Sequence, residues 1–173
     1  ENPREDIPKA SLLTAAFFVA SWIHIPVPPT SVHLVLNGLL GAILGYFAFP
    51  AILIGLFFQA VMFQHGGLTT LGVNAIIMGS PAIVAHYIFR LRKLGNKESR
   101  GKTGVLGFLA GAVALGISVA MFVVILLTSL PADLDVGTER AAIYTLAIAH
   151  LPLIAIEGVI TSMLAVFLQR VRP

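Results

Sequence analysis

The charged residues of this sequence lie almost entirely outside its long apolar runs, which limits the chain to folds that suit a lipid environment. One long run, residues 104–130, contains no charged side chain. A helix needs roughly 20 apolar residues to cross about 30 Å of hydrocarbon, and this run is long enough to cross with a tilt. Charged residues make up 11% of the chain, against about 25% in soluble domains. We therefore predict an integral membrane protein.

Six apolar segments predict an all-α, polytopic membrane helix bundle that forms a single domain over residues 1–173. They are residues 10–25, 32–49, 51–63, 74–89, 104–130 and 141–168. Pro50 is expected to close the second segment with a turn at Phe49 and Pro50. The first, third and fourth segments are short for complete spans, so we expect protein rather than lipid to cover their ends.

The loops predict an orientation in the cell (inner or plasma) membrane. Loop 90–102 carries six basic residues and one acid, whereas loop 130–140 carries three acids and one base. Cytoplasmic loops are enriched in Lys and Arg, so the basic loop and the C-terminus are expected inside and the acidic loop outside. A solvated loop explains the basic residues better than a nucleic-acid patch. Counting backwards, QHGGLTTLGVN (residues 64–74) lies outside, and one more helix upstream would place the N-terminus outside.

Four of the five histidines converge on this predicted outer face. They are His24, His33, His65 and His150. His86 belongs to the inner end. Plainer roles stay open for three of the four: His24 could be an interfacial anchor, His65 could fix the hairpin by hydrogen bonds, and His150 could satisfy a backbone group freed by the nearby proline.

Glu157 is the only charged residue within a predicted span. A carboxylate at a helix centre costs roughly 2.5–3.5 kcal/mol on insertion scales, so such a residue usually faces protein and has a function. His150 and Thr161 share its helix face. We favour a role as acceptor for N–H groups of the hairpin over direct metal ligation.

The available donors are compatible with a borderline divalent metal. Imidazoles and carboxamides suit Ni, Co, Cu or Zn, and the absence of cysteine excludes thiolate sites. Neither an HExxH nor a Walker A sequence is present, which argues against a zinc protease or an ATPase. We expect no catalysis in this chain, and if the protein transports a substrate actively, the energy comes from elsewhere.

Glycines recur at the spacing of closely packed membrane helices. They are Gly38, Gly41, Gly45, Gly104, Gly107, Gly111 and Gly116. Packing within the chain and docking to a partner are both compatible with this pattern.

Three stretches resemble the CbiM/NikM family, the substrate-specific membrane components of cobalt and nickel energy-coupling factor (ECF) transporters. They are PPTSVHLVLNGLLGAILG (28–45), FFQAVMFQHGGLTTLGVNAIIMG (57–79) and HLPLIAIEGVIT (150–161). The resemblance covers almost the whole chain, and QxxxxxHGGxTTLGxN is its most specific motif.

The resemblance implies capture of Co²⁺ or Ni²⁺ as the transported substrate on the outer face. In the family, an N-terminal Met-His and a His that matches His33 hold the metal. His65 is a further candidate ligand. Asn74, Glu157, His150 and Thr69 are expected to brace the loops around it. This sequence has no Met-His at its start and lacks the helix that follows, so we expect an upstream segment to supply ligands.

The resemblance also implies partners: a transmembrane coupling (T) subunit, cytoplasmic ATPase (A) subunits, a small accessory membrane subunit and the surrounding lipid. Such an ABC-type importer would supply cobalt for cobalamin biosynthesis, while the choice between cobalt and nickel stays open. Two alternatives are a stand-alone cation channel or secondary transporter that uses Glu157 and His150, and a purely structural membrane subunit.

Overall fold

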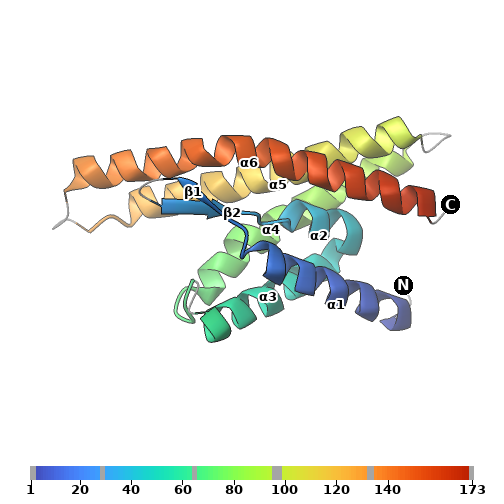
Figure 1. Cartoon of the computed structure of the whole chain (residues 1–173), viewed down its shortest axis with the longest axis horizontal. Coiled ribbons are helices and arrows are strands. Elements are labelled where there is room, and N and C mark those ends of the chain that lie inside the picture. The colour runs from blue at the N-terminus through green and yellow to red at the C-terminus, as the bar shows by residue number, and fades with distance from the viewer. Residues whose placement is uncertain (1–2, 28–29, 64–65, 95–98, 132–134, 172–173) are drawn as a thin grey trace.

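The computed structural model is a bundle of six α-helices with one short β-hairpin (Figure 1). It describes residues 3–27, 30–63, 66–94, 99–131 and 135–171. The elements are α1 (Pro3–Ala20), β1 (His24–Val27), β2 (Thr30–His33), α2 (Asn37–Leu44), η1 (Gly45–Phe47), α3 (Ala48–Phe63), α4 (Leu71–Arg90), η2 (Leu91–Lys93), α5 (Arg100–Thr128) and α6 (Val136–Val171). The predicted class, an all-α polytopic membrane bundle, is confirmed.

Four helical stretches in the described residues are long and apolar enough to cross a membrane. They are Asn37–Phe63, Leu71–Lys93, Arg100–Thr128 and Val136–Val171, with Ile7–Ala20 as a shorter apolar helix. The first of these contains both α2 and α3. Because α2 has only eight residues, too few to cross a bilayer, the predicted second segment does not form a span of its own.

The predicted helix over residues 32–49 is wrong at both ends. Its first residues belong to β2, and α2 begins only at Asn37. The chain then reverses at Gly45, whose φ of 61° is a backbone conformation that glycine adopts without steric cost. Pro50 lies in the first turn of α3 rather than in the reversal, because a missing N–H costs nothing at a helix start.

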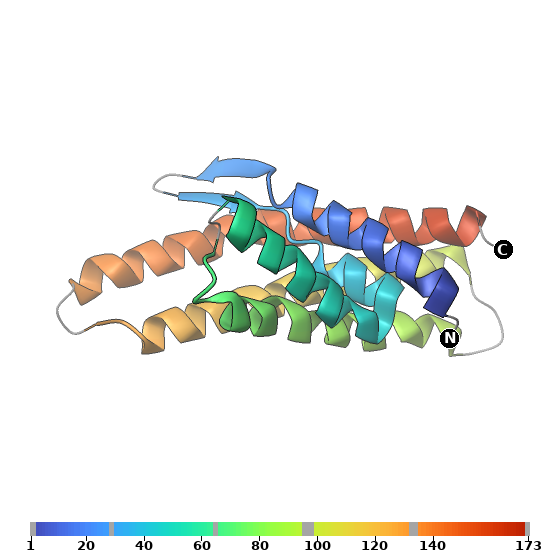
Figure 2. The same ribbon diagram turned by 90° about the horizontal axis from the view of Figure 1, so that it is seen from below.

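Helices α5 and α6 run antiparallel, side by side, along the length of the molecule (Figures 1 and 2). Glycine allows this close approach: a Cβ on Gly111 would lie 2.7 Å from the carbonyl oxygen of Glu157, and one on Gly107 would lie 3.0 Å from the Cα of Ser162. The short helix α2 is equally close to its neighbours. A Cβ on Gly41 would lie 1.9 Å from the carbonyl oxygen of Ala82 in α4. These glycines pack within the chain.

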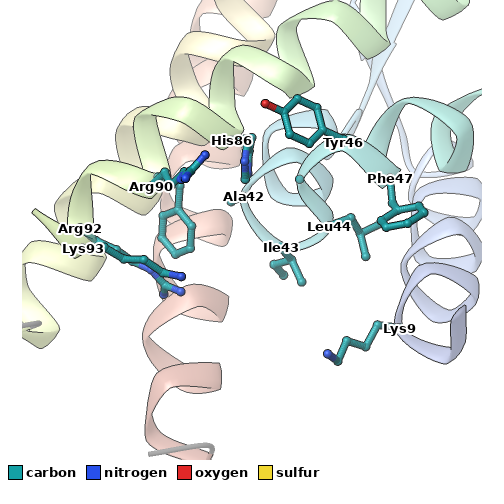
Figure 3. Close-up of a pocket in the computed structure, with 12 residues that line it drawn as sticks. Lys9, Ala42, Ile43, Leu44, Tyr46, Phe47, His86, Arg90, Arg92 and Lys93 are labelled. Carbon is teal, nitrogen blue, oxygen red and sulfur yellow. The ribbon is translucent and has the colours of Figure 1, made fainter. Parts of the chain in front are cut away.

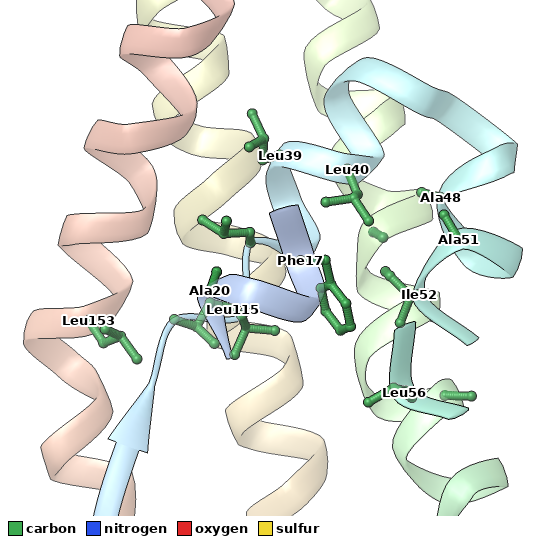
Figure 4. Packing of buried hydrophobic residues seen from close by; sticks show 14 of the residues in the cluster. Phe17, Ala20, Leu39, Leu40, Ala48, Ala51, Ile52, Leu56, Leu115 and Leu153 are labelled. Carbon is green, nitrogen blue, oxygen red and sulfur yellow. The ribbon is translucent and has the colours of Figure 1, made fainter. Parts of the chain in front are cut away.

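The buried core takes residues from every helix, among them Phe17, Leu40, Ile52, Leu115 and Leu153 (Figure 4). Large apolar side chains such as Phe57 and Phe167 are exposed on the outside of the bundle. An apolar exterior of this extent suits contact with lipid.

The two ends of the molecule differ in charge. The N-terminus, the C-terminus and the adjoining ends of α4 and α5 lie together at one end, whereas the connection between α5 and α6 lies at the other (Figures 1 and 2). The basic residues thus share an end with both termini, as the sequence predicts. Which end faces the cytoplasm stays a prediction.

Candidate functional site

A cavity of about 310 Å³ lies where the end of β2 meets helices α3 to α6. Its polar lining comes from His33, Gln59, Asn74, Ser118 and His150, and the rest is mostly apolar. Three residues that the sequence singles out, His33, Asn74 and His150, therefore line one cavity although they are far apart in the chain. This is the candidate site.

His33 is the last residue of β2 and is half-buried. Its Nδ1 lies 3.0 Å from the carbonyl oxygen of Leu34. When Nδ1–H donates to that carbonyl, the lone pair resides on Nε2, which is the form that a metal-binding imidazole needs. The backbone thus selects a tautomer suited to metal binding.

His150 lies on α6, and its Nδ1 is 2.8 Å from the carbonyl oxygen of Leu146. The bond reaches back one helical turn to Leu146, whereas the carbonyl that Pro152 leaves without its helical donor is that of Ile148, so this contact is not the structural role that the sequence left open. Because the ring also lines the cavity, it can supply a nitrogen there as well.

Glu157 holds the segment that follows His33. Its side chain is fully buried, and its Oε1 accepts hydrogen bonds from the backbone N–H groups of Val35 and Leu36. Leu36 has a φ of 55°, a left-handed conformation that costs a non-glycine residue about 1–2 kcal/mol. The carboxyl group does not line the cavity, and its position matches a brace.

Asn37 and Gln59 are buried polar residues to which the sequence analysis gave no role, although Gln59 is the first residue of the QxxxxxHGGxTTLGxN motif. Asn37 donates from Nδ2 to the carbonyl oxygen of Met78 at 3.1 Å and to Oγ of Ser118 at 2.8 Å. It thereby ties α2 to α4 and α5 beside the cavity. Gln59 is 2% exposed and lines the cavity. A single carboxamide inside an apolar run is the signal that could have found both.

The hairpin between α3 and α4 reaches the cavity through Gly66. Gly66 and Gly67 have φ values of 77° and 68°, so glycine is required there. Asn74 donates from Nδ2 to Oγ1 of Thr70 at 3.3 Å. Thr69 is exposed and is not part of the cavity lining.

His65, the other predicted ligand, lies outside the described residues, as does the side chain of His24. Within the part of the chain that the structure describes, no three His, Cys, Asp or Glu side chains gather closely enough to hold a metal ion. The described donors at the cavity are two imidazoles and two carboxamides, which suit borderline divalent metals. His86 lines a different cavity, in agreement with its predicted separation from the other histidines.

The chain is similar to a family of known proteins. The whole chain, residues 1–173, matches the family described as CbiM, cobalt uptake substrate-specific transmembrane region. A protein of Haemophilus influenzae described as a metal transport protein is 36% identical over 170 residues, which cover 98% of this chain and 79% of that protein. A protein of Methanocorpusculum labreanum described as a fused cobalt transport protein, CbiMQ, is 33% identical over 178 residues, which cover 99% of this chain and 29% of the fusion.

The fold is similar to one known from a crystal structure of a transition metal transporter. The TM-score is 0.73 at 24% sequence identity, and the match covers 99% of this chain and 79% of the other. Together with the family match over the full chain, these similarities show that the chain is a membrane component for metal transport and belongs to the CbiM family.

Proposed function

We propose that this chain captures Co²⁺ or Ni²⁺ at the extracytoplasmic face of the membrane, as the substrate-binding component of an ATP-driven ECF transporter. The observation that carries the proposal is the shared cavity of His33, Asn74 and His150, with Gly66 of the hairpin in the same lining. Family membership supports a metal as the transported substrate, and cobalt in particular.

In this proposal Nε2 of His33 is a metal ligand, and His65, one residue before Gly66, is a second candidate. Asn74 and Thr69 shape the hairpin over the ion. Glu157 fixes the backbone that carries His33.

The coupling and energy are proposed to come from other subunits. A T subunit would transmit motion, paired A subunits would hydrolyse ATP, and a small accessory membrane subunit would complete the assembly. The fused relative CbiMQ supports a partner of the CbiQ type, because it joins CbiM to this further part in one chain. This chain would bind the ion and perform no catalysis.

The contacts of Glu157 and His150 favour this function over a cation channel or secondary transporter. A proton or cation relay needs groups that face a pathway. Glu157 instead accepts backbone N–H bonds away from the cavity, and Nδ1 of His150 is engaged by a helix carbonyl.

The first test is calorimetric titration of Co²⁺ and Ni²⁺ into the purified full gene product, followed by uptake assays in cells. We expect His33→Ala to abolish metal uptake and His65→Ala to reduce it less. Tyr144→Ala, which removes an exposed ring from the same half of α6 as His150, is the matched control and should leave uptake unchanged.

Two results would contradict the proposal. Uptake by His33→Ala at the level of the parent would remove the assigned ligand. Uptake that continues without the ATPase subunits would show a stand-alone transporter.

A further inference from the structure

A second cavity, of about 370 Å³, lies at the end of the bundle that carries the basic residues (Figure 3). Lys9 of α1 forms one side, and Arg90, Arg92 and Lys93 at the end of α4 and in η2 form the other, with Ile43 between them. No acidic residue is among its described lining residues. The cavity is therefore suited to a group with negative charge.

An apolar groove of about 420 Å³ lies next to this cavity. The two share Lys9, Phe89 and Arg92 in their linings, and the groove adds Leu12 and Leu168 along α1 and α6. The carbon at the centre of the Arg92 guanidinium group lies 4.2 Å from the centre of the Phe89 ring, so this cation sits over an aromatic face. A cationic cavity thus passes directly into an apolar groove.

A buried acceptor in the groove points to a ligand. The side-chain oxygen of Gln169, a residue that lines the groove, is buried and has no hydrogen-bond partner within the described residues. Buried polar atoms are normally hydrogen-bonded. A ligand whose headgroup carries a hydroxyl group would satisfy this oxygen.

We propose that the cationic cavity and the apolar groove form one binding site for an anionic phospholipid. The lipid phosphate would lie against Arg92 and Lys93, and an acyl chain would lie along the groove between α1 and α6. Basic residues beside membrane helices recognise such headgroups. Two acidic residues, Glu5 and Asp6, lie about one helical turn before Lys9 and offset its charge. The proposal therefore depends on Arg92 and Lys93 on the opposite wall. It is independent of the metal site.

The test is native mass spectrometry of the detergent-solubilised protein titrated with dioleoyl phosphatidylglycerol. Arg92→Gln combined with Lys93→Gln is the test variant. Arg100→Gln combined with Arg170→Gln is the matched control, because it removes two exposed positive charges from the same end without touching either cavity. Dioleoyl phosphatidylcholine and inorganic phosphate are added in parallel to distinguish a lipid from a free anion. Thermal unfolding of each variant confirms that it is folded.

We expect the test variant to bind phosphatidylglycerol roughly twentyfold more weakly than the parent, since each cation near an anionic lipid contributes about fivefold. The control variant should change by less than about threefold, and Lys9→Gln should give an intermediate loss. Equal losses in the two double variants would show only a general charge effect and overturn the proposal. Displacement of the lipid by inorganic phosphate, or equal binding of phosphatidylcholine, would also overturn it.

Discussion

A single carboxyl group fixes the geometry next to the proposed metal ligand. Glu157 binds the N–H groups of Val35 and Leu36, only two and three residues after His33. It also stabilises the left-handed backbone at Leu36. Strained backbone persists only where the surroundings determine it, and it is common at functional sites.

Substitution of Glu157 separates a brace from a relay. Glu157→Gln keeps a side-chain oxygen that can accept both N–H bonds, so we expect it to retain most of the stability and metal uptake. Glu157→Ala leaves two buried N–H groups without a partner, at about 1–3 kcal/mol each, and should lower both. Thermal unfolding and cellular metal accumulation measure the two effects. Loss of uptake by a stably folded Glu157→Gln would instead show that an ionisable group is needed.

Asp135 lies just before α6, at the acidic end of the molecule, and its contacts predict that the local stability there depends on pH. The hydroxyl of Thr138 and the backbone N–H of Gly137 donate to its carboxylate and lower its pKa below the ordinary value. A pKa that is lower in the folded state gives stability that is present above the unfolded value of about 4 and is lost as the pH falls below it. The protection of amides at the start of α6 against hydrogen exchange, measured relative to their intrinsic exchange rate at each pH, should therefore fall at acidic pH. Asp135→Asn should weaken that pH dependence.

Residue types predicted part of the site. His33, Asn74 and His150 could be brought together from the sequence because the alternation of loop charges orders the segments. Asn37 was missed since its role depends on which carbonyl and hydroxyl lie opposite it in α4 and α5. No local pattern specifies those partners.

At the level of elements, α2 depends on close approach to its neighbours. It has only eight residues, too few to form a stable helix alone. Its glycines let it contact α4 and α5 without intervening side chains. The orientation of the cavity-lining strand that precedes it depends on this packing.

Gly41→Ala tests this packing. The added methyl group would lie 1.9 Å from the carbonyl oxygen of Ala82, a clash that backbone movement must relieve at a cost of about 1–3 kcal/mol or more. Gly72→Ala in α4 is the control, because a Cβ there meets nothing within 4 Å and alanine favours a helix by about 1 kcal/mol. We expect the midpoint temperature of thermal unfolding to fall for Gly41→Ala and to stay level or rise for Gly72→Ala. A Gly41→Ala protein as stable as the parent would refute the close packing.

The long helices α5 and α6 were predictable because charged loops flank their long apolar runs, and α4 was predictable because its apolar run ends at the basic loop. The β-hairpin was not, since the proline-rich stretch after His24 is typical of a simple break between helices. The reversal at Gly45 was assigned to Pro50 instead. Proline is compatible with both a turn and a first helical turn, and only the packing of α2 on α4 decides between them.

For the whole molecule, the distribution of charge predicts which end faces the cytoplasm. The chain contains no cysteine, so single cysteines introduced at Arg100 and Val136 can report accessibility without background. Both positions are exposed. Arg100 begins α5 and Val136 begins α6, and because these helices are antiparallel, the two positions lie at opposite ends of the molecule. We expect a membrane-impermeant thiol reagent to label Val136→Cys in intact cells and Arg100→Cys only after permeabilisation. The reverse pattern would invert the proposed orientation and place the metal cavity on the cytoplasmic side.

The bond between Glu157 and Val35 has a consequence for biosynthesis. Its two residues are 122 positions apart, and a ribosome makes the N-terminal partner first. The strand end that carries His33 therefore has no carboxyl group to hold it until most of α6 has been made, and closing so large a loop has an entropic cost. In a nascent or truncated chain that stops before residue 157, the strand that carries His33 lacks this hydrogen bond, so the cavity becomes complete only after residue 157 has been made.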